Sequence, residues 1–280
     1  MNIQNYLQCF IERLQIQRYS PTSIKNYQSN LLLFLTVAAH KYSTAKEIEI
    51  AAIEKYIHWK IKKDNISASH QRIILASITK FYELVLEKRI NLKHLYPQRK
   101  EYKLPNYLST TEIKKLIEVT DNLKHKSIIM VLYSGGLRLS EVVNLKITDI
   151  DSKAMTITIR QAKGKKDRQV MLSENFLLIL RQYYLKFKPN FYLFEGQNSL
   201  QYSARSIQQI VKQITLKSGI NKTVSPHVIR HSFATHLIEA GTDIRYIQKL
   251  LGHNHVKTTQ IYTQITDVAK NKIKSPLDRL

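Results

Sequence analysis

A ten-residue segment without any apolar period divides this chain of 280 residues into two parts. It runs from Tyr96 to Pro105 and contains two prolines and a cluster of basic side chains. Prolines combined with a lack of hydrophobic periodicity are typical of a linker. We therefore predict a helical domain over residues 1–95, a linker over residues 96–105 and a second domain over residues 106–280.

Apolar residues recur at helical spacing throughout the first part, which predicts four helices. They run over Ile3–Ile16, from Thr22 or Ser23 to about Ala39, from about Ala51 to Lys63, and from Ser67 to about Lys88. Thr22 or Ser23 is the expected cap of the second helix because the Ser20-Pro21 pair interrupts the pattern before it. Four helices in fewer than 100 residues favour a compact helical domain.

The second part has mainly helical patterns, with one stretch that alternates as a strand does. Ser109 and Glu112 have the spacing of a capping box, so a helix should begin there. Apolar and polar residues alternate over 155–160, and Arg168–Leu172 is predicted to return beside them after a lysine-rich turn. Further helices are expected at about Ser173–Phe187 and Ser203–Lys217, from Ser225 to Gly241, and from Asp243 to Gly252. The predicted fold is mostly α-helical with a small antiparallel β-sheet.

The charge of the chain gives the first indication of its partner. Lys and Arg total 44 and Asp and Glu total 21, so the formal net charge is +23; residues 1–100 carry +9 and residues 101–280 carry +14. Because both parts are basic, a polyanion such as DNA is the expected partner, bound in a salt-dependent way. A lysine-rich protein without such a partner would have the same composition, so charge alone leaves both possibilities open.

Cysteine content and hydropathy restrict the class of protein further. The chain has a single cysteine, Cys9, which excludes an intrachain disulfide framework. Its longest apolar run, Leu31–Ala39, is far shorter than the roughly 20 residues of a membrane span. The first residues do not have the pattern of a signal peptide. We therefore expect a soluble, cytoplasmic protein without a membrane partner.

Two predicted turns carry basic residues that could act on a phosphate. Arg138 follows the paired glycines of Ser-Gly-Gly-Leu-Arg, which should end one helix, and Ser140 is the expected cap of the next. An arginine there can bind a phosphate or a carboxylate, and taken alone an ion pair with Glu141 is the favoured interpretation. Lys163 lies at the tip of the predicted hairpin, within reach of a DNA groove. Lys165, Lys166 and Arg168 are further candidate DNA contacts, although a solvated turn is the simpler interpretation for the two lysines.

Histidines gather in the last third of the chain. His227 and Arg230 are three residues apart, so they share a helix face near an N-terminus, where anions bind well. His231 and His236 are five residues apart, a spacing that fits a helical zinc pair poorly, and we interpret them as core or supporting residues. His253 follows Leu-Leu-Gly, and Tyr262 comes nine residues later; neither indicates a function by itself.

Taken in order, these residues resemble the catalytic signature of the tyrosine recombinase family, which includes phage integrases and Xer recombinases. The matching residues are Arg138 in Gly-Leu-Arg-Leu-Ser-Glu, Lys163, His227-x-x-Arg230, His253 in Leu-Gly-His, and Tyr262. The resemblance covers about residues 105–265, and the first part resembles the family's SAM-like core-binding domain more loosely. The arm-type domain of larger phage integrases has no counterpart here, which favours a Xer-like or simple two-domain integrase.

The resemblance implies a site-specific recombinase that cleaves and rejoins duplex DNA through a covalent 3′-phosphotyrosyl intermediate. Integration, excision and dimer resolution are the tasks it implies. Tyr262 would be the nucleophile and Lys163 the general acid for the departing 5′-oxygen. Arg138, Arg230 and His253 would stabilise the phosphate oxygens, with the arginines in place of a metal, so that no cofactor is expected. The remaining roles are proton transfer with Tyr262 for His227 and orientation of the site for Glu141.

The resemblance also implies an assembly. Relatives act as tetramers on two DNA sites, so a homo-tetramer on double-stranded DNA is expected, with the tail Thr266–Leu280 docked on a neighbouring protomer. The sequence leaves open the DNA target and the need for a second recombinase. It also leaves open three other functions: a catalytically silent DNA-binding protein on this fold, a type IB topoisomerase-like enzyme, and a metalloenzyme built on the histidines.

Overall fold

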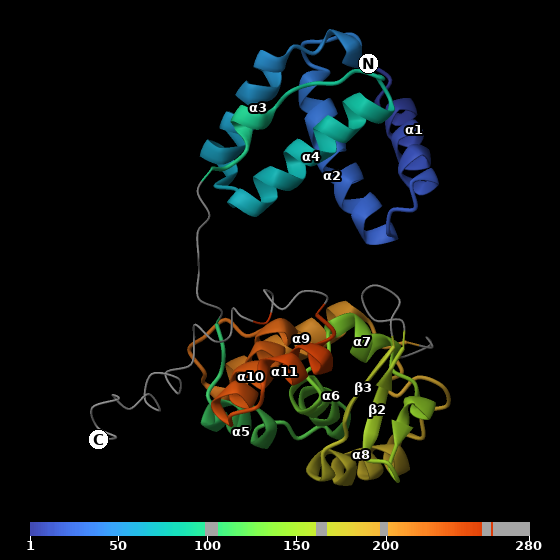
Figure 1. The fold of residues 1–280 in the computed structure, drawn as a ribbon, viewed down its shortest axis with the longest axis vertical. Coiled ribbons are helices and arrows are strands. Elements are labelled where there is room, and N and C mark those ends of the chain that lie inside the picture. The colour runs from blue at the N-terminus through green and yellow to red at the C-terminus, as the bar shows by residue number, and fades with distance from the viewer. Residues whose placement is uncertain (99–105, 161–166, 197–200, 254–258, 260–280) are drawn as a thin grey trace, which may run out of the picture. The chain divides into compact units, whose positions relative to one another are not determined.

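The computed structural model divides into two units, Met1–Tyr102 and Lys103–Leu280 (Figure 1). The structure describes residues 1–98, 106–160, 167–196, 201–253 and 259. Among these residues, no helix is both long and apolar enough to cross a membrane.

The helices of the first unit close around one apolar core. They are α1 (Ile3–Ile16), α2 (Pro21–Ala38), α3 (Ile50–Asp64) and α4 (Ala68–Leu84). The helix α4 packs on both α1 and α2, and the aromatic rings of Phe10, Phe34 and Phe81 are fully buried between them. The expected four-helix arrangement is confirmed for this unit.

Two details of these helices differ from the sequence-based expectation. The cap of α2 is Ser20, whose Oγ accepts from the backbone N–H of Ser23, and Pro21 occupies the first helical position. Proline is well suited to that position because its missing N–H would have no partner there. The helix α4 ends at Leu84 rather than near Lys88, since the backbone turns left-handed at Glu87 with φ +53°.

The second unit is built around the helix α6 (Leu123–Ser134). This helix packs against α5 (Thr110–Glu118), α7 (Leu139–Asn144), α8 (Glu174–Phe187), α9 (Ala204–Ser218) and α10 (Pro226–Glu239). The last described helix, α11 (Ile244–Leu251), lies against α10 and reaches the sheet. Surrounded by these partners, α6 buries Ile128, Ile129, Val131 and Leu132 completely. The mostly helical class is therefore confirmed for this unit too.

A small antiparallel sheet flanks these helices. Its strands are β1 (Ile150–Asp151), β2 (Thr156–Ile159) and β3 (Arg168–Met171), in the order β1-β2-β3. The register sets Ile157 opposite Val170, and both side chains are buried. The sequence predicts the β2–β3 pair and misses β1, because a two-residue strand is too short for an alternating pattern.

A helix cap in the second unit fixes the position of Glu141 relative to Arg138. The capping box of Ser109 and Glu112 opens α5 as expected. Ser140, in contrast, does not cap α7: the cap position belongs to Arg138, whose backbone N–H donates to Glu141 Oε2 over 2.7 Å. The glutamate at the third helical position satisfies this otherwise unpaired N–H, so the expectation for Ser140 was wrong. Glu141 is thereby fixed beside Arg138.

Candidate active site

The turn between α6 and α7 brings a backbone carbonyl against α10. Gly136 has φ +56°, and a Cβ atom built on it would lie 2.3 Å from the ring of Phe233, so only glycine fits here. This close approach lets the Gly136 carbonyl accept a 2.6 Å hydrogen bond from Arg230 Nη1. The paired glycines thus do more than end α6: they set Arg138 and Arg230 beside each other.

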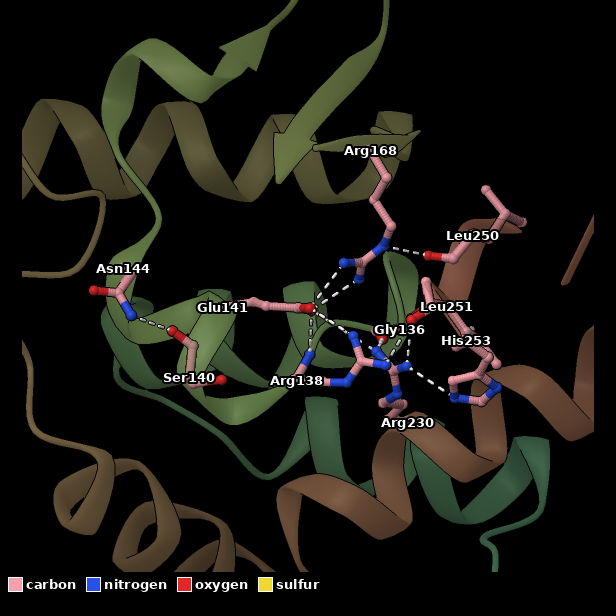
Figure 2. Close-up of polar contacts among 11 residues, drawn as sticks. Gly136, Arg138, Ser140, Glu141, Asn144, Arg168, Arg230, Leu250, Leu251 and His253 are labelled. Carbon is pink, nitrogen blue, oxygen red and sulfur yellow. Dashed lines mark hydrogen bonds and ion pairs between the residues drawn. The ribbon is translucent and has the colours of Figure 1, made fainter. Parts of the chain in front are cut away.

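Glu141 is the acceptor at which three arginines converge (Figure 2). Its side chain is 5% exposed, and its carboxylate accepts from Arg138 Nη1 over 2.8 Å. Arg168 donates in a fork, from Nη1 to Oε1 over 2.7 Å and from Nη2 to Oε2 over 2.8 Å. Arg230 Nη1 lies 3.8 Å from Oε2, close enough for attraction without a hydrogen bond.

The protonation of Glu141 follows from these neighbours. Burial raises the pKa of its carboxyl, but the hydrogen bonds and charge of Arg168, and then those of Arg138, outweigh this effect and bring the pKa to about 2. Glu141 is therefore ionised at neutral pH. One negative charge faces three guanidinium groups, which leaves the cluster with a net positive charge suited to an anion.

Three successive carbonyls at the end of α11 each accept from a different arginine. Leu250 accepts from Arg168 Nε over 2.6 Å, Leu251 from Arg230 Nη2 over 2.6 Å, and Gly252 from Arg138 Nη2 over 3.0 Å. Carbonyls at a helix C-terminus carry partial negative charge and have no partner within the helix. The end of α11 is therefore a second acceptor that, like Glu141, holds all three arginines in place.

The two arginines of the sequence signature differ in accessibility. The side chain of Arg138 is 23% exposed, whereas that of Arg230 is 1% exposed. Arg230 is the largest fully buried side chain of the described residues. Arg138 is therefore accessible to an anion, whereas Arg230 lies beneath the surface and holds the site from within the protein.

His253 stands at the edge of this cluster with a defined proton. Its Nε2 lies 3.2 Å from Arg230 Nη2 and its Nδ1 lies 3.0 Å from Thr259 Oγ1. Because a guanidinium can only donate, Nε2 accepts and the ring proton is on Nδ1, facing Thr259. Burial lowers the pKa of His253 to about 4, and the charges of Arg230, Arg138 and Arg168 lower it too, so the ring is neutral at pH 7.

Three further histidines, His227, His231 and His236, lie on α10. The rings of His227 and His231 are in edge contact, with centroids 4.1 Å apart. Burial, followed by the charges of Arg230 and Arg138, lowers the pKa of His227; burial and then His227 and Arg230 bring the pKa of His231 to about 4. His236 is paired through Nδ1 with the hydroxyl of Tyr133 at 2.9 Å. Among the described residues, no three His, Cys, Asp or Glu side chains are grouped as metal ligands would be.

The structure brings together five of the residues singled out from the sequence, which are Arg138, Glu141, His227, Arg230 and His253. Lys163, Tyr262, Lys165, Lys166 and the tail Thr266–Leu280 lie outside the described residues.

Arg168 requires a correction. It was expected to contact DNA, but its side chain is 9% exposed and its Nε, Nη1 and Nη2 atoms all donate within the protein. Its partners are 27 and 82 residues away along the chain, so the sequence carries no local signal for this position. The role of the carbonyls 250–252 was missed for the same reason.

Comparisons with known proteins agree on one family. Residues 106–268 match the phage integrase family, and residues 6–92 match the phage integrase N-terminal SAM-like domain. Tyrosine recombinase XerD of Oceanobacillus iheyensis is 31% identical over 92% of this chain and 92% of its own length. A crystal structure of XerA recombinase is 32% identical over 98% of this chain and 100% of its own, with TM-score 0.57. XerH bound to a palindromic difH substrate shares the fold at TM-score 0.75 and 21% identity, over 93% of this chain and 81% of its own.

Proposed function

This chain belongs to the phage integrase family, and on that premise we propose that it is a site-specific tyrosine recombinase acting on double-stranded DNA. The observation that carries the proposal is the convergence of Arg138 and Arg230 on Glu141 and on the end of α11. Preorganised guanidinium groups with excess positive charge stabilise the charge that develops on a phosphate during transfer. The basic character of both parts of the chain supports DNA as the carrier of that phosphate.

The proposed reaction proceeds in two steps, cleavage and rejoining. The hydroxyl oxygen of Tyr262 attacks the scissile phosphorus, the bond to the 5′-oxygen breaks, and a 3′-phosphotyrosyl bond forms. Lys163 supplies the proton to the departing 5′-oxygen, and His227 takes part in proton transfer with Tyr262. In the second step the 5′-hydroxyl oxygen of another strand attacks the same phosphorus: a new bond to the 5′-oxygen forms, the bond to the tyrosine oxygen breaks, the hydroxyl gives up its proton and Tyr262 regains one. The energy of the phosphodiester is conserved, so the proposal needs neither ATP nor a metal.

The arginines divide the work of charge stabilisation in this proposal. Arg138 contacts a non-bridging oxygen directly, because its side chain is open to solvent. Arg230 is 1% exposed, so a contact with phosphate requires its surroundings to rearrange when DNA binds. We expect its hydrogen bond to His253 to break first, because the hydrogen bonds to the carbonyls of Gly136 and Leu251 are shorter. His253 would then donate to the phosphate through Nε2, which requires its proton to move from Nδ1.

The assembly is part of the proposal as well. We propose a homo-tetramer that holds two DNA sites, with the tail Thr266–Leu280 docked on a neighbouring protomer. Each active site would then depend on its neighbour, which is the arrangement that strand exchange between two duplexes requires.

A two-site plasmid assay tests the proposed activity. Candidate sites from the DNA that flanks the gene are placed twice in one supercoiled plasmid, and products are resolved after incubation with purified protein. Deletion or inversion between the sites supports a recombinase. Relaxation of a plasmid without the sites supports the topoisomerase-like alternative, and tight binding without any strand exchange or relaxation supports the silent DNA-binding alternative.

A further inference from the structure

Arg168 connects three parts of the second unit through one side chain. It opens β3, directly after residues 161–166, and its guanidinium reaches both α7 and α11 (Figure 2). The fork on Glu141 uses Nη1 and Nη2, and Nε donates to the Leu250 carbonyl. A planar guanidinium is the only side-chain group that can make these three bonds at once, since an ammonium acts as a point charge.

The bidentate contact of Arg168 with Glu141 limits the contacts that Arg138 and Arg230 make with the same carboxylate. A buried carboxylate without a bidentate partner would draw nearby guanidinium groups onto itself. Arg168 takes one position on each carboxylate oxygen, and the Arg138 guanidinium donates to Oε1 through Nη1, while the Arg138 backbone N–H donates to Oε2. Arg230 stays 3.8 Å away and donates instead to Gly136 and Leu251. Arg168 thereby keeps the carboxylate from capturing the two arginines that are proposed to face phosphate.

The bond to Leu250 extends this control to α11. The next two carbonyls along the chain hold Arg230 and Arg138, and the residue after them is His253. The contact is tight: a Cβ atom on Gly252 would lie 3.1 Å from Arg168 Cδ. A displacement of Arg168 would therefore shift the carbonyls 250–252 and His253 relative to Glu141.

We propose that Arg168 is a positioning residue of the recombination reaction, which places Arg138, Arg230 and His253 by holding Glu141 and the end of α11, without contacting DNA. This inference rests on the function proposed above. Arg168 follows the segment that carries Lys163 in the sequence, and its side chain joins the start of β3 to the arginine cluster.

The test compares two substrates that differ in charge at the scissile position. One is a nicked suicide duplex with an ordinary phosphodiester, and the other carries a neutral methylphosphonate there. Single-turnover formation of the covalent adduct is measured for wild type, Arg168→Gln and Arg168→Lys. Arg160→Gln is the matched control, because Arg160 follows the neighbouring strand β2 and its guanidinium pairs with the buried Asp149.

On the phosphodiester we expect Arg168→Gln to slow adduct formation roughly 100-fold, the scale of losing one preorganised charge-stabilising group. Duplex binding should change less than about threefold, since Arg168 makes no phosphate contact in the proposal. On the methylphosphonate the wild-type-to-variant rate ratio should fall at least about tenfold, because a neutral transition state needs less help from the arginines. Arg168→Lys should lie between, and Arg160→Gln should match wild type on both substrates.

An equal loss on both substrates, in proportion to a lower thermal midpoint, would overturn the inference, since a merely structural role reduces the folded fraction alike for either substrate. An unchanged rate for Arg168→Gln would overturn it as well. If Arg168→Gln does not fold, the rate ratio of Arg168→Lys on the two substrates decides. If wild type forms no adduct on any candidate site, the proposed recombinase function fails first, and this inference fails with it.

Discussion

Arg230 donates to His253 Nε2 across 3.2 Å and thereby fixes which nitrogen of the imidazole carries the proton. The Nδ1–H group of the ring points toward Thr259, and the lone pair on Nε2 points toward the guanidinium of Arg230. Arg230, which is 1% exposed, and His253, which is neutral because its pKa is about 4, thus form a hydrogen-bonded pair at the end of α11. Because His253 is held neutral in this pair, the stability of the second part of the chain is sensitive to acid.

We expect the free energy of unfolding to fall as the pH drops from about 6.5 toward 4. The pKa values of His231 and His253 are lowered from 6.5 to about 4 in the folded protein, so in this window the unfolded chain binds more protons. Each histidine contributes a slope of at most about 1.4 kcal/mol per pH unit. Urea unfolding of wild type and His231→Gln between pH 4 and 7.5 measures it. Identical slopes for the two proteins would contradict the expectation.

Glu141→Gln should destabilise the protein by about 3 kcal/mol, because it leaves buried guanidinium groups without their carboxylate. The pKa of Glu141 is lowered from 4.5 to about 2, so its contribution is complete above pH 4.5 and is lost as the pH falls toward 2. Acid titrations of the two proteins should therefore differ above pH 4.5 and converge below it. Asp121→Asn, which removes an 85% exposed partner of Lys217, is the control and should leave the free energy of unfolding nearly unchanged.

Gly136→Ala should destabilise the second unit by about 3 kcal/mol, the sum of a left-handed backbone strain and a clash in a packed core. The added Cβ would meet Phe233 at 2.3 Å and force apart the contact that lets Gly136 accept from Arg230. Gly241→Ala is a matched control, since Gly241 has φ +85° but nothing within 4 Å of the new atom. It should cost only about 1 kcal/mol. Equal losses in denaturant unfolding would show that packing at Gly136 does not matter.

Lys163→Ala should slow DNA cleavage, and a 5′-phosphorothiolate substrate should restore the rate. A thiolate leaves without a proton, so a general acid is no longer needed. The rate of single-turnover cleavage on oxygen and sulfur substrates gives the answer, with Lys153→Ala, an exposed lysine just before β2, as the control. Failure of the sulfur substrate to rescue the variant would remove Lys163 from its proposed role.

The sequence predicts the helices well where caps and apolar periods coincide. Ser225 with Pro226 opens α10, and Asp243 with Gly252 brackets α11, so the elements that carry Arg230 and precede His253 could be placed in advance. The pairing of Arg138 with Glu141 was also accessible, because residues three apart at a helix start meet locally.

The expectation for Arg168, unlike the local one for the cap at Ser140, was wrong because its contacts are with distant segments. Arg168 follows a lysine-rich turn, and its local pattern indicates a surface cation; only the fold reveals that Glu141 and Leu250 lie within reach. Backbone carbonyls such as those of 250–252 carry no sequence signature at all. The burial of Arg230 has the same origin, since three elements close around it.

Covalent trapping on DNA tests whether Tyr262 is the nucleophile. Wild type and Tyr262→Phe are incubated with nicked suicide duplexes that carry candidate sites, and the products are separated on denaturing gels. We expect a protein–DNA adduct with wild type and none with Tyr262→Phe, while both proteins bind the duplex equally. An adduct that persists in Tyr262→Phe would show that another residue is the nucleophile. The absence of an adduct in wild type on every site, despite tight binding and added host extract, would contradict the proposed phosphotyrosyl intermediate.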